Sequence, residues 1–146
     1  MAKKYRRKRK GKIQSKQTTV DGIKFRSKLE AFTYKTLKEN NIPLEYESEK
    51  FTLLDSYNYD ETTYEQSTKG YRDKSDTKVR AVTYLPDFLC PDRTWIIECK
   101  GYANDRFPIK WKMFKKHLLD NNKSCKLFVP KNQKQVRETI EIIKNL

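Results

Sequence analysis

Residues 86–101 read Pro-Asp-Phe-Leu-Cys-Pro-Asp-Arg-Thr-Trp-Ile-Ile-Glu-Cys-Lys-Gly. Two apolar runs are separated by a short polar stretch that contains proline, a pattern typical of a turn. We therefore predict a hairpin of two strands, residues 81–89 and 94–100, that places Asp87 opposite Glu98. Because side chains at positions i and i+2 of a strand share a face, Glu98 and Lys100 should point the same way and Cys99 the other.

Placing Asp87 and Glu98 close together in an apolar hairpin costs free energy, and this cost indicates their chemistry. Two carboxylates about 4 Å apart repel by roughly 4 kcal/mol at an effective dielectric constant near 20, and an unpaired carboxylate within an apolar strand is costly to bury. A cation or a proton must relieve that repulsion. A divalent metal beside a lysine is an arrangement suited to phosphodiester hydrolysis, so the hairpin predicts a nuclease. Two simpler interpretations stay open: Asp87 as a turn acid, and Lys100 as the ion-pair partner of Glu98.

Composition favours an intracellular protein with a polyanionic partner. The 146 residues fit a single domain, and a net charge of +14 with an isoelectric point near 9.7 favours binding to phosphates. The sequence shows neither a membrane-spanning apolar run nor a secretory signal, so we expect a cytoplasmic location. Three cysteines outside metal-binding spacings and one histidine argue for a reducing compartment, and against a zinc site or triad catalysis.

The first 17 residues form a basic segment. Between residues 1 and 12 there are eight basic residues and no acid, which predicts a disordered arm that binds nucleic acid. A solubilising or localisation tail is the alternative. The basic residues are Lys3, Lys4, Arg6, Arg7, Lys8, Arg9, Lys10 and Lys12.

Residues 18–146 are predicted to form one α/β domain, a mixed central sheet flanked by helices in the order α-β-β-β-α-β-α. Helices are expected from 27 to about 40, from 108 to 119 and from 133 to 145. A strand or turn is expected at 18–25, with Asp21-Gly22 as the turn, and a strand at 126–129. Residues 44–46 and 51–54 are expected to form a strand pair or one bent strand.

Residues 55–80 differ from the rest of the chain. They are polar, mixed in charge and rich in tyrosine, with almost no aliphatic residues. A segment of this length without periodicity is unusual inside a compact domain. We expect a long loop, a mobile insertion or a partner-binding excursion.

Glu30 allows two interpretations. It completes the capping box Ser27-Lys28-Leu29-Glu30 at the start of the first helix, which by itself accounts for an acid there. At about 100° per residue it also lies beside Tyr34 and Leu37, at the edge of the buried arc. From that edge, a carboxylate could reach a metal held by the sheet.

The order of these motifs resembles a known family. Pro86-Asp87 followed by Glu98-Cys99-Lys100 resembles the PD-(D/E)xK nuclease signature. More narrowly, residues 23–105 resemble the phage endonuclease I family of Holliday-junction resolvases, and residues 20–25 resemble the opening of a broader group of phage resolvase-like proteins. The stretches that carry the narrower resemblance are Phe25-Arg26-Ser27-Lys28-Leu29-Glu30, Leu44-Glu45-Tyr46-Glu47, Pro86-Asp87-Phe88-Leu89, Glu98-Cys99-Lys100-Gly101 and Asp105-Arg106.

The resemblance implies a PD-(D/E)xK core with Glu30, Asp87, Glu98 and Lys100 as the active site, and Mg²⁺ as cofactor, for which Mn²⁺ should substitute. It also implies a homodimer with exchanged strands that cuts branched DNA, encoded by a phage and acting in its bacterial host. Asp87, Glu98, Glu30 and the main-chain carbonyl of Cys99 would hold the metal. Residues 55–80 lie where the family has its subunit-bridging stretch, and are longer here.

Basic residues near the predicted site are candidates for phosphate contacts, which position a protein on DNA without reading its sequence. Nothing resembles a major-groove recognition module, so we expect selection of four-way junctions by shape. The candidates are Lys24, Arg26, Lys28, Arg106, Lys110 and Lys112.

Three other functions remain open at this point. The first is a sequence-specific or nicking endonuclease that acts on linear duplex DNA with the same core. The second is a non-catalytic, basic nucleic-acid-binding protein, and the third is a small structural protein of ribosomal type. The last two leave Glu98, within an apolar strand, without an explanation.

Overall fold

A computed structural model describes residues 15–102, 104 and 106–146 of the chain. It confirms a mixed α/β fold, with a central sheet of four strands in the order β12-β11-β10-β3. β11 pairs with β12 in parallel, and the other two pairings are antiparallel. The strands are β3 (Glu45–Tyr46), β10 (Phe88–Leu89), β11 (Trp95–Ile97) and β12 (Lys126–Phe128).

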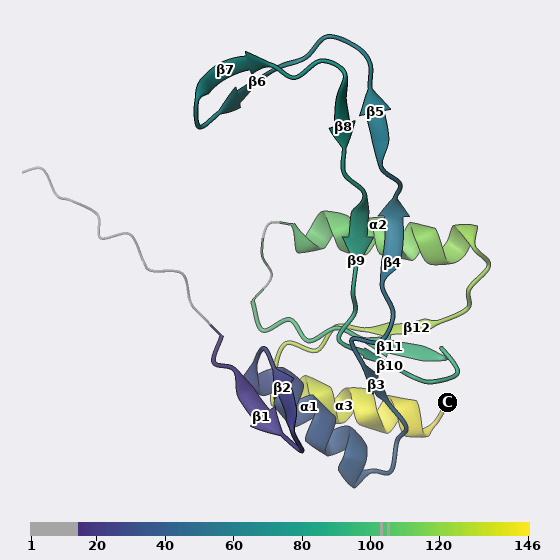
Figure 1. Cartoon of the computed structure of the whole chain (residues 1–146). Helices are drawn as coiled ribbons and strands as arrows, with labels where there is room; N and C mark the ends of the chain where they lie inside the picture. Colours follow the sequence, from purple (N-terminus) through teal and green to yellow (C-terminus); the bar gives the residue numbers. More distant parts are fainter. Residues whose placement is uncertain (1–14, 103, 105) are drawn as a thin grey trace, which may run out of the picture.

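Three helices cover this sheet, α1 and α3 on one face and α2 on the other (Figure 1). Strands alternate their side chains between two faces, so Phe88 and Ile97 pack towards α1 and α3, whereas Leu89 and Ile96 pack towards α2. The central hairpin is therefore buried on both faces. The helices are α1 (Lys28–Glu39), α2 (Phe107–Asp120) and α3 (Gln133–Lys144).

The helix starts follow capping rules. The side chain of Ser27 accepts the amide hydrogen of Glu30 at 3.2 Å, and that of Asn132 accepts the amide hydrogen of Gln135 at 2.9 Å. Pro108 occupies the first turn of α2, where a missing N–H is tolerated.

The predicted turn at Asp21-Gly22 is confirmed. It joins β1 (Thr18–Val20) to β2 (Ile23–Phe25) in an antiparallel hairpin, with φ values of 50° and 77° at the two turn residues. Positive φ at two central turn residues suits aspartate and glycine. The hairpin leads directly into α1, and so fixes where that helix begins.

The prediction of one strand over residues 81–89 is wrong, because this stretch forms two strands. β9 (Val82–Tyr84) pairs with β4 (Phe51–Leu54), whereas β10 pairs with β3 and β11. Pro86 lies between β9 and β10, and its missing N–H prevents a continuous ladder. The expected pairing of 44–46 with 51–54 is also wrong, because β3 and β4 belong to different sheets.

Residues 55–80 are not an irregular loop. They form a hairpin arm that projects away from the helices and the central sheet (Figure 1). No residue between 52 and 83 is buried. The sequence therefore lacks the alternation of apolar and polar residues that predicts a half-buried strand. In the arm, β5 (Tyr57–Tyr59) pairs with β8 (Thr77–Val79), and β6 (Tyr64–Ser67) pairs with β7 (Gly70–Asp73).

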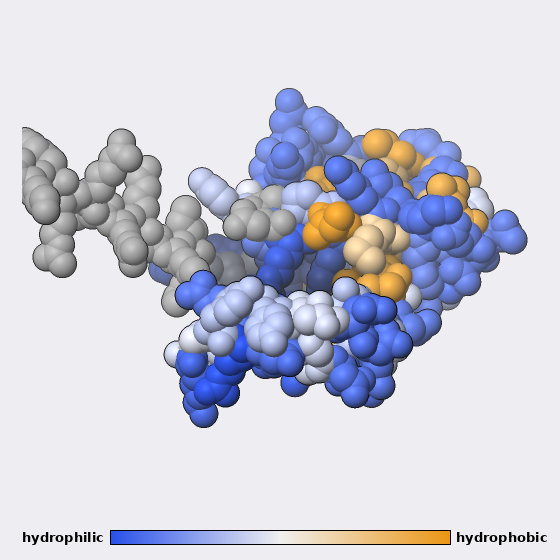
Figure 2. Space-filling view, turned by 90° about the horizontal axis from the view of Figure 1, so that it is seen from above, coloured by the Kyte–Doolittle hydropathy of each residue, from blue (hydrophilic) through white to orange (hydrophobic). Residues whose placement is uncertain are grey.

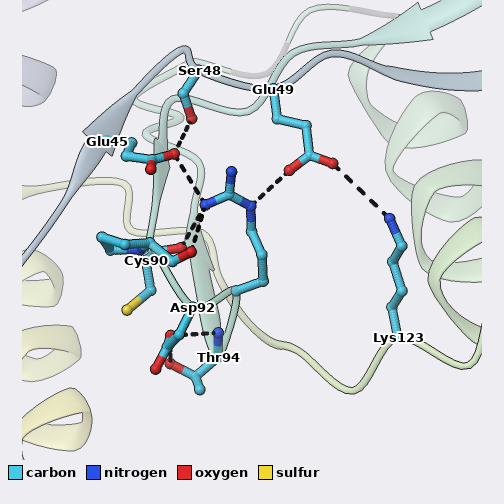
Figure 3. A network of polar contacts seen from close by, with 9 residues as sticks. Glu45, Ser48, Glu49, Cys90, Asp92, Thr94 and Lys123 are labelled. Carbon is cyan, nitrogen blue, oxygen red and sulfur yellow. Dashed lines mark hydrogen bonds and ion pairs between the residues drawn. The ribbon is translucent and has the colours of Figure 1, made fainter.

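Arg93 fixes the turn between β10 and β11. It has a φ of 64°, and its guanidinium donates to the carbonyls of Cys90 and Pro91. Figure 3 shows the surrounding network, in which the guanidinium also contacts Glu45 at 3.0 Å and Glu49 at 2.6 Å. These contacts tie the turn to β3 and to the segment that follows it, and so hold the hairpin that carries Asp87 and Glu98.

None of the helices in the described part of the chain is long and apolar enough to cross a membrane.

Candidate functional site

The structure places Asp87 opposite Glu98. The pairing of Phe88 with Ile97 fixes this register, because Asp87 and Glu98 are the next residues on each strand. Oδ2 of Asp87 accepts the amide hydrogen of Cys99 at 2.7 Å. Both acids are buried, with 7% and 3% of their surface exposed. The hairpin thus holds two carboxylates in an apolar setting, as the sequence predicts.

Lys100 is the cation beside Glu98. Its ammonium group lies 2.8 Å from Oε1 of Glu98. The same nitrogen lies 5.0 Å from the ring centroid of Phe107, at the start of α2. The ion pair matches the simpler interpretation of Lys100, and it also puts a positive charge inside the acidic cluster.

Glu30 approaches the cluster from α1, and it is also a helix cap. Its Oε2 accepts the amide hydrogen of Arg26 at 3.1 Å, and its Oε1 accepts the hydroxyl of Ser27 at 2.8 Å. The side chain is nonetheless buried and faces the same cleft as Asp87 and Glu98. The two interpretations of Glu30 are therefore compatible in this structure.

Two tyrosines that the sequence analysis did not select hold the glutamates. The hydroxyl of Tyr84 donates to Oε2 of Glu98 at 2.6 Å, and that of Tyr46 donates to Oε2 of Glu30 at 2.7 Å. Burial, with the adjacent glutamate, raises the pKa of both phenols far above the ordinary value, so both stay proton donors. Tyr46 lies in the stretch Leu44-Glu45-Tyr46-Glu47 that carries the resemblance, whereas no sequence signal separates Tyr84 from the other tyrosines.

Tyr84 and the charged side chains described above line one cleft of about 740 Å³ between α1, β9 and the start of α2, whereas Tyr46 does not line it. Figure 2, which views the molecule from above, shows a hollow with blue, hydrophilic atoms inside it and orange, hydrophobic atoms along one side. The lining includes all three acids together with Lys100. An open, charged cleft of this kind fits a polar substrate.

The electrostatics of the cleft centre on Asp87. Burial raises the pKa of its carboxyl well above the usual 3.8, and the negative charges of Glu98 and Glu30 raise it further. The Cys99 amide and the Lys100 ammonium oppose that rise in pKa. A further positive charge in the cleft would therefore favour the ionised form of Asp87.

The predicted phosphate contacts fall into three groups. Arg26, Arg106 and Lys110 line the cleft, and Arg26 also forms an ion pair with Glu47. Three others are exposed but do not line it, namely Lys24, Lys28 and Lys112. The seven basic residues predicted between positions 3 and 10, and also Asp105, lie outside the described residues.

The donor set suits a hard cation. Within the described residues, no three histidine, cysteine, aspartate or glutamate side chains are arranged as a metal site. Mg²⁺ commonly binds through one or two carboxylates, with waters and substrate phosphates completing its shell. Asp87 and Glu98 meet that requirement, because both are buried carboxylates that face the cleft. Glu30 adds a third negative charge.

Residues 10–134 match the profile of a family described as protein of unknown function (DUF1064). The chain belongs to this family. The matched region contains Glu30, Asp87, Glu98 and Lys100, as well as the hairpin arm. No curated protein and no solved structure gives a significant match to the chain.

Proposed function

We propose that this chain is a Mg²⁺-dependent endodeoxyribonuclease of the PD-(D/E)xK type that resolves branched DNA by phosphodiester hydrolysis. The observation that carries the proposal is the meeting of Asp87, Glu98 and Lys100 in one cleft, with Glu30 facing the same space. A buried carboxyl whose pKa is raised by burial and by specific charged neighbours, such as that of Asp87, is a candidate functional group when it lies in a cleft.

Each residue has a role in this proposal. Asp87, Glu98 and the main-chain carbonyl of Cys99 would hold Mg²⁺, for which Mn²⁺ would substitute. A bound Mg²⁺ supplies positive charge that lowers the pKa of water and stabilises negative charge on a phosphate. Lys100 would orient the attacking water or offset the charge that builds on the scissile phosphate. Glu30 would orient waters near the cation.

The order of the elements supports a PD-(D/E)xK core. When only the strands of the central sheet are counted, the chain runs α1-β3-β10-β11-α2-β12-α3. This order is consistent with the α-β-β-β-α-β-α order that we predict from the sequence. The β1–β2 hairpin and the hairpin arm are then additions to that core.

The charge of the molecule supports DNA as the substrate. Arg26, Arg106 and Lys110 line the cleft and are more exposed than its acids, so they are available to contact a phosphate backbone there. Cutting both strands of a junction requires two sites, and we therefore propose that the active species is a homodimer.

The test is cleavage of a four-way DNA junction and of a linear duplex with matched sequence, in Mg²⁺ and then in EDTA. Cleavage of the junction alone, lost in EDTA, is the expected result. Cleavage of both substrates would indicate a general nuclease, and cleavage of the duplex at one sequence a restriction-type or nicking enzyme. Binding without cleavage in any metal would contradict the proposal and favour a non-catalytic DNA-binding protein.

A further inference from the structure

Tyr84 is held rigidly next to the cleft. Its side chain is 6% exposed, and its ring centroid lies 4.7 Å from that of Phe114 and 6.2 Å from that of Trp111. The adjacent carbonyl of Thr83 accepts a hydrogen bond from Nζ of Lys110 at 3.0 Å. Both the ring and its strand are thus fixed against α2, and the hydroxyl is the one polar group that the ring presents to Glu98.

Glu98 has two donors, one on each oxygen. Lys100 contacts Oε1 at 2.8 Å, and Tyr84 donates to Oε2 at 2.6 Å. The lysine is a long side chain with several rotatable bonds, so it can follow a change in Glu98. The phenol cannot, because its ring extends from β9 and packs against Trp111 and Phe114 of α2. Tyr84 is therefore the contact that fixes the orientation of the carboxylate.

We propose that Tyr84 is a positioning residue, which holds Oε2 of Glu98 and so fixes the orientation in which this carboxylate meets the cation and the phosphate in the cleft. The inference rests on the proposed function. Groups that hydrogen-bond to metal ligands typically contribute about 10- to 100-fold to metal affinity or activity. Tyr84 is the last residue of β9, the strand that follows the hairpin arm. Its hydrogen bond to Glu98 therefore links this strand to the cleft.

The test compares two substitutions that each remove one hydroxyl. Tyr84→Phe keeps the ring and removes the donor to Glu98. Tyr34→Phe is the matched control, because Tyr34 is also 6% exposed and donates to a carboxylate, that of Asp21 at 3.1 Å, but does not line the cleft. Both variants lose a hydroxyl–carboxylate hydrogen bond, and Tm should fall further for Tyr84→Phe, because Glu98 is buried whereas Asp21 is exposed to water that can replace the lost donor.

The primary measurement is Mn²⁺ binding to the full-length protein without DNA, followed by electron paramagnetic resonance and checked by competition with Mg²⁺. We expect Tyr84→Phe to raise the Kd for Mn²⁺ by about 10-fold or more, and Tyr34→Phe to leave it unchanged. The Mg²⁺ concentration that gives half-maximal cleavage should rise by the same factor in Tyr84→Phe. A merely structural role for the phenol would not separate the two variants in this way.

Two results would overturn the inference, and they differ in what they say of the proposed function. If wild-type protein and Tyr84→Phe bind Mn²⁺ equally well and cleave DNA with the same Mg²⁺ dependence, the nuclease stands and the role of Tyr84 is rejected. If wild-type protein neither binds Mn²⁺ nor cleaves DNA, the proposed function fails, and the inference fails with it.

Discussion

The amide hydrogen of Cys99 is bound by Oδ2 of Asp87 at 2.7 Å, across the two strands of the central hairpin. This bond locks the register that places Asp87 beside Glu98. Both acids are buried, and the pKa of Asp87 is raised by burial and by its acidic neighbours. Substitutions at these acids should therefore change stability and, if the proposed function holds, cleavage as well.

Glu98→Gln should abolish cleavage while binding to a four-way junction is kept or strengthened. The amide has nearly the same shape as the carboxylate, but it removes one negative charge from a cleft that must accept phosphates. We expect cleavage to fall by about 100-fold or more, by comparison with the loss of other charge-stabilising groups. Glu138→Gln on α3 is the control, because Glu138 is exposed and lies outside the cleft. A Glu98→Gln protein that cleaves at the normal rate would contradict the assignment of Glu98 to the active site.

Asp87→Asn should make the metal-free protein more stable at neutral pH. The folded pKa of Asp87 is raised above 3.8, so between that value and the raised pKa the folded state holds a proton that the unfolded state has lost. Stability falls across that window as pH rises, by about 1.4 kcal/mol per pH unit for this group. The advantage of the variant over wild type should therefore grow above pH 4 and vanish below it.

The measurement is urea unfolding of both proteins in EDTA at a series of pH values. Addition of Mg²⁺ should stabilise wild type more than Asp87→Asn, because the cation binds the ionised carboxylate. A stability difference that does not change with pH would show that Asp87 titrates normally in the folded protein.

Removing the outer part of the hairpin arm should leave the rest of the fold intact. Replacement of residues 58–78 by Asn-Gly would join the paired residues Tyr57 and Val79 through a two-residue turn. None of the deleted residues is buried, so little apolar contact is lost, and we expect Tm to change by no more than about 2 °C. A fall of more than about 5 °C would mean that the arm contributes to the core.

Arg93→Ala should destabilise the fold without a direct effect on Mg²⁺ dependence. Arg93 contacts Glu45 and Glu49, each about one third exposed, so each ion pair is partly screened by solvent. We expect a loss of about 1 kcal/mol in the free energy of unfolding, measured by urea denaturation. Lys116→Ala, which removes an exposed pair with Asp120, is the control and should change stability by less than half as much.

Local sequence signals predicted the central hairpin and the helices well. The apolar runs around Pro91 fixed the pairing of β10 with β11, and Val136, Ile140 and Ile143 are buried at the helical spacing. These features depend on residues close together in the chain. The strands of the hairpin arm were not predicted, because their exposed residues show no alternation of apolar and polar positions.

The amino-acid sequence by itself determined the helices, the central hairpin and the pairing of Asp87 with Glu98, since register and capping follow from neighbouring residues. Tertiary structure alone decided which strands join which sheet, and that Tyr84 and Tyr46 would each hold a glutamate from another element. Such contacts join residues 14 or more positions apart. They exist only once packing on α1 and α2 has fixed where each side chain lies.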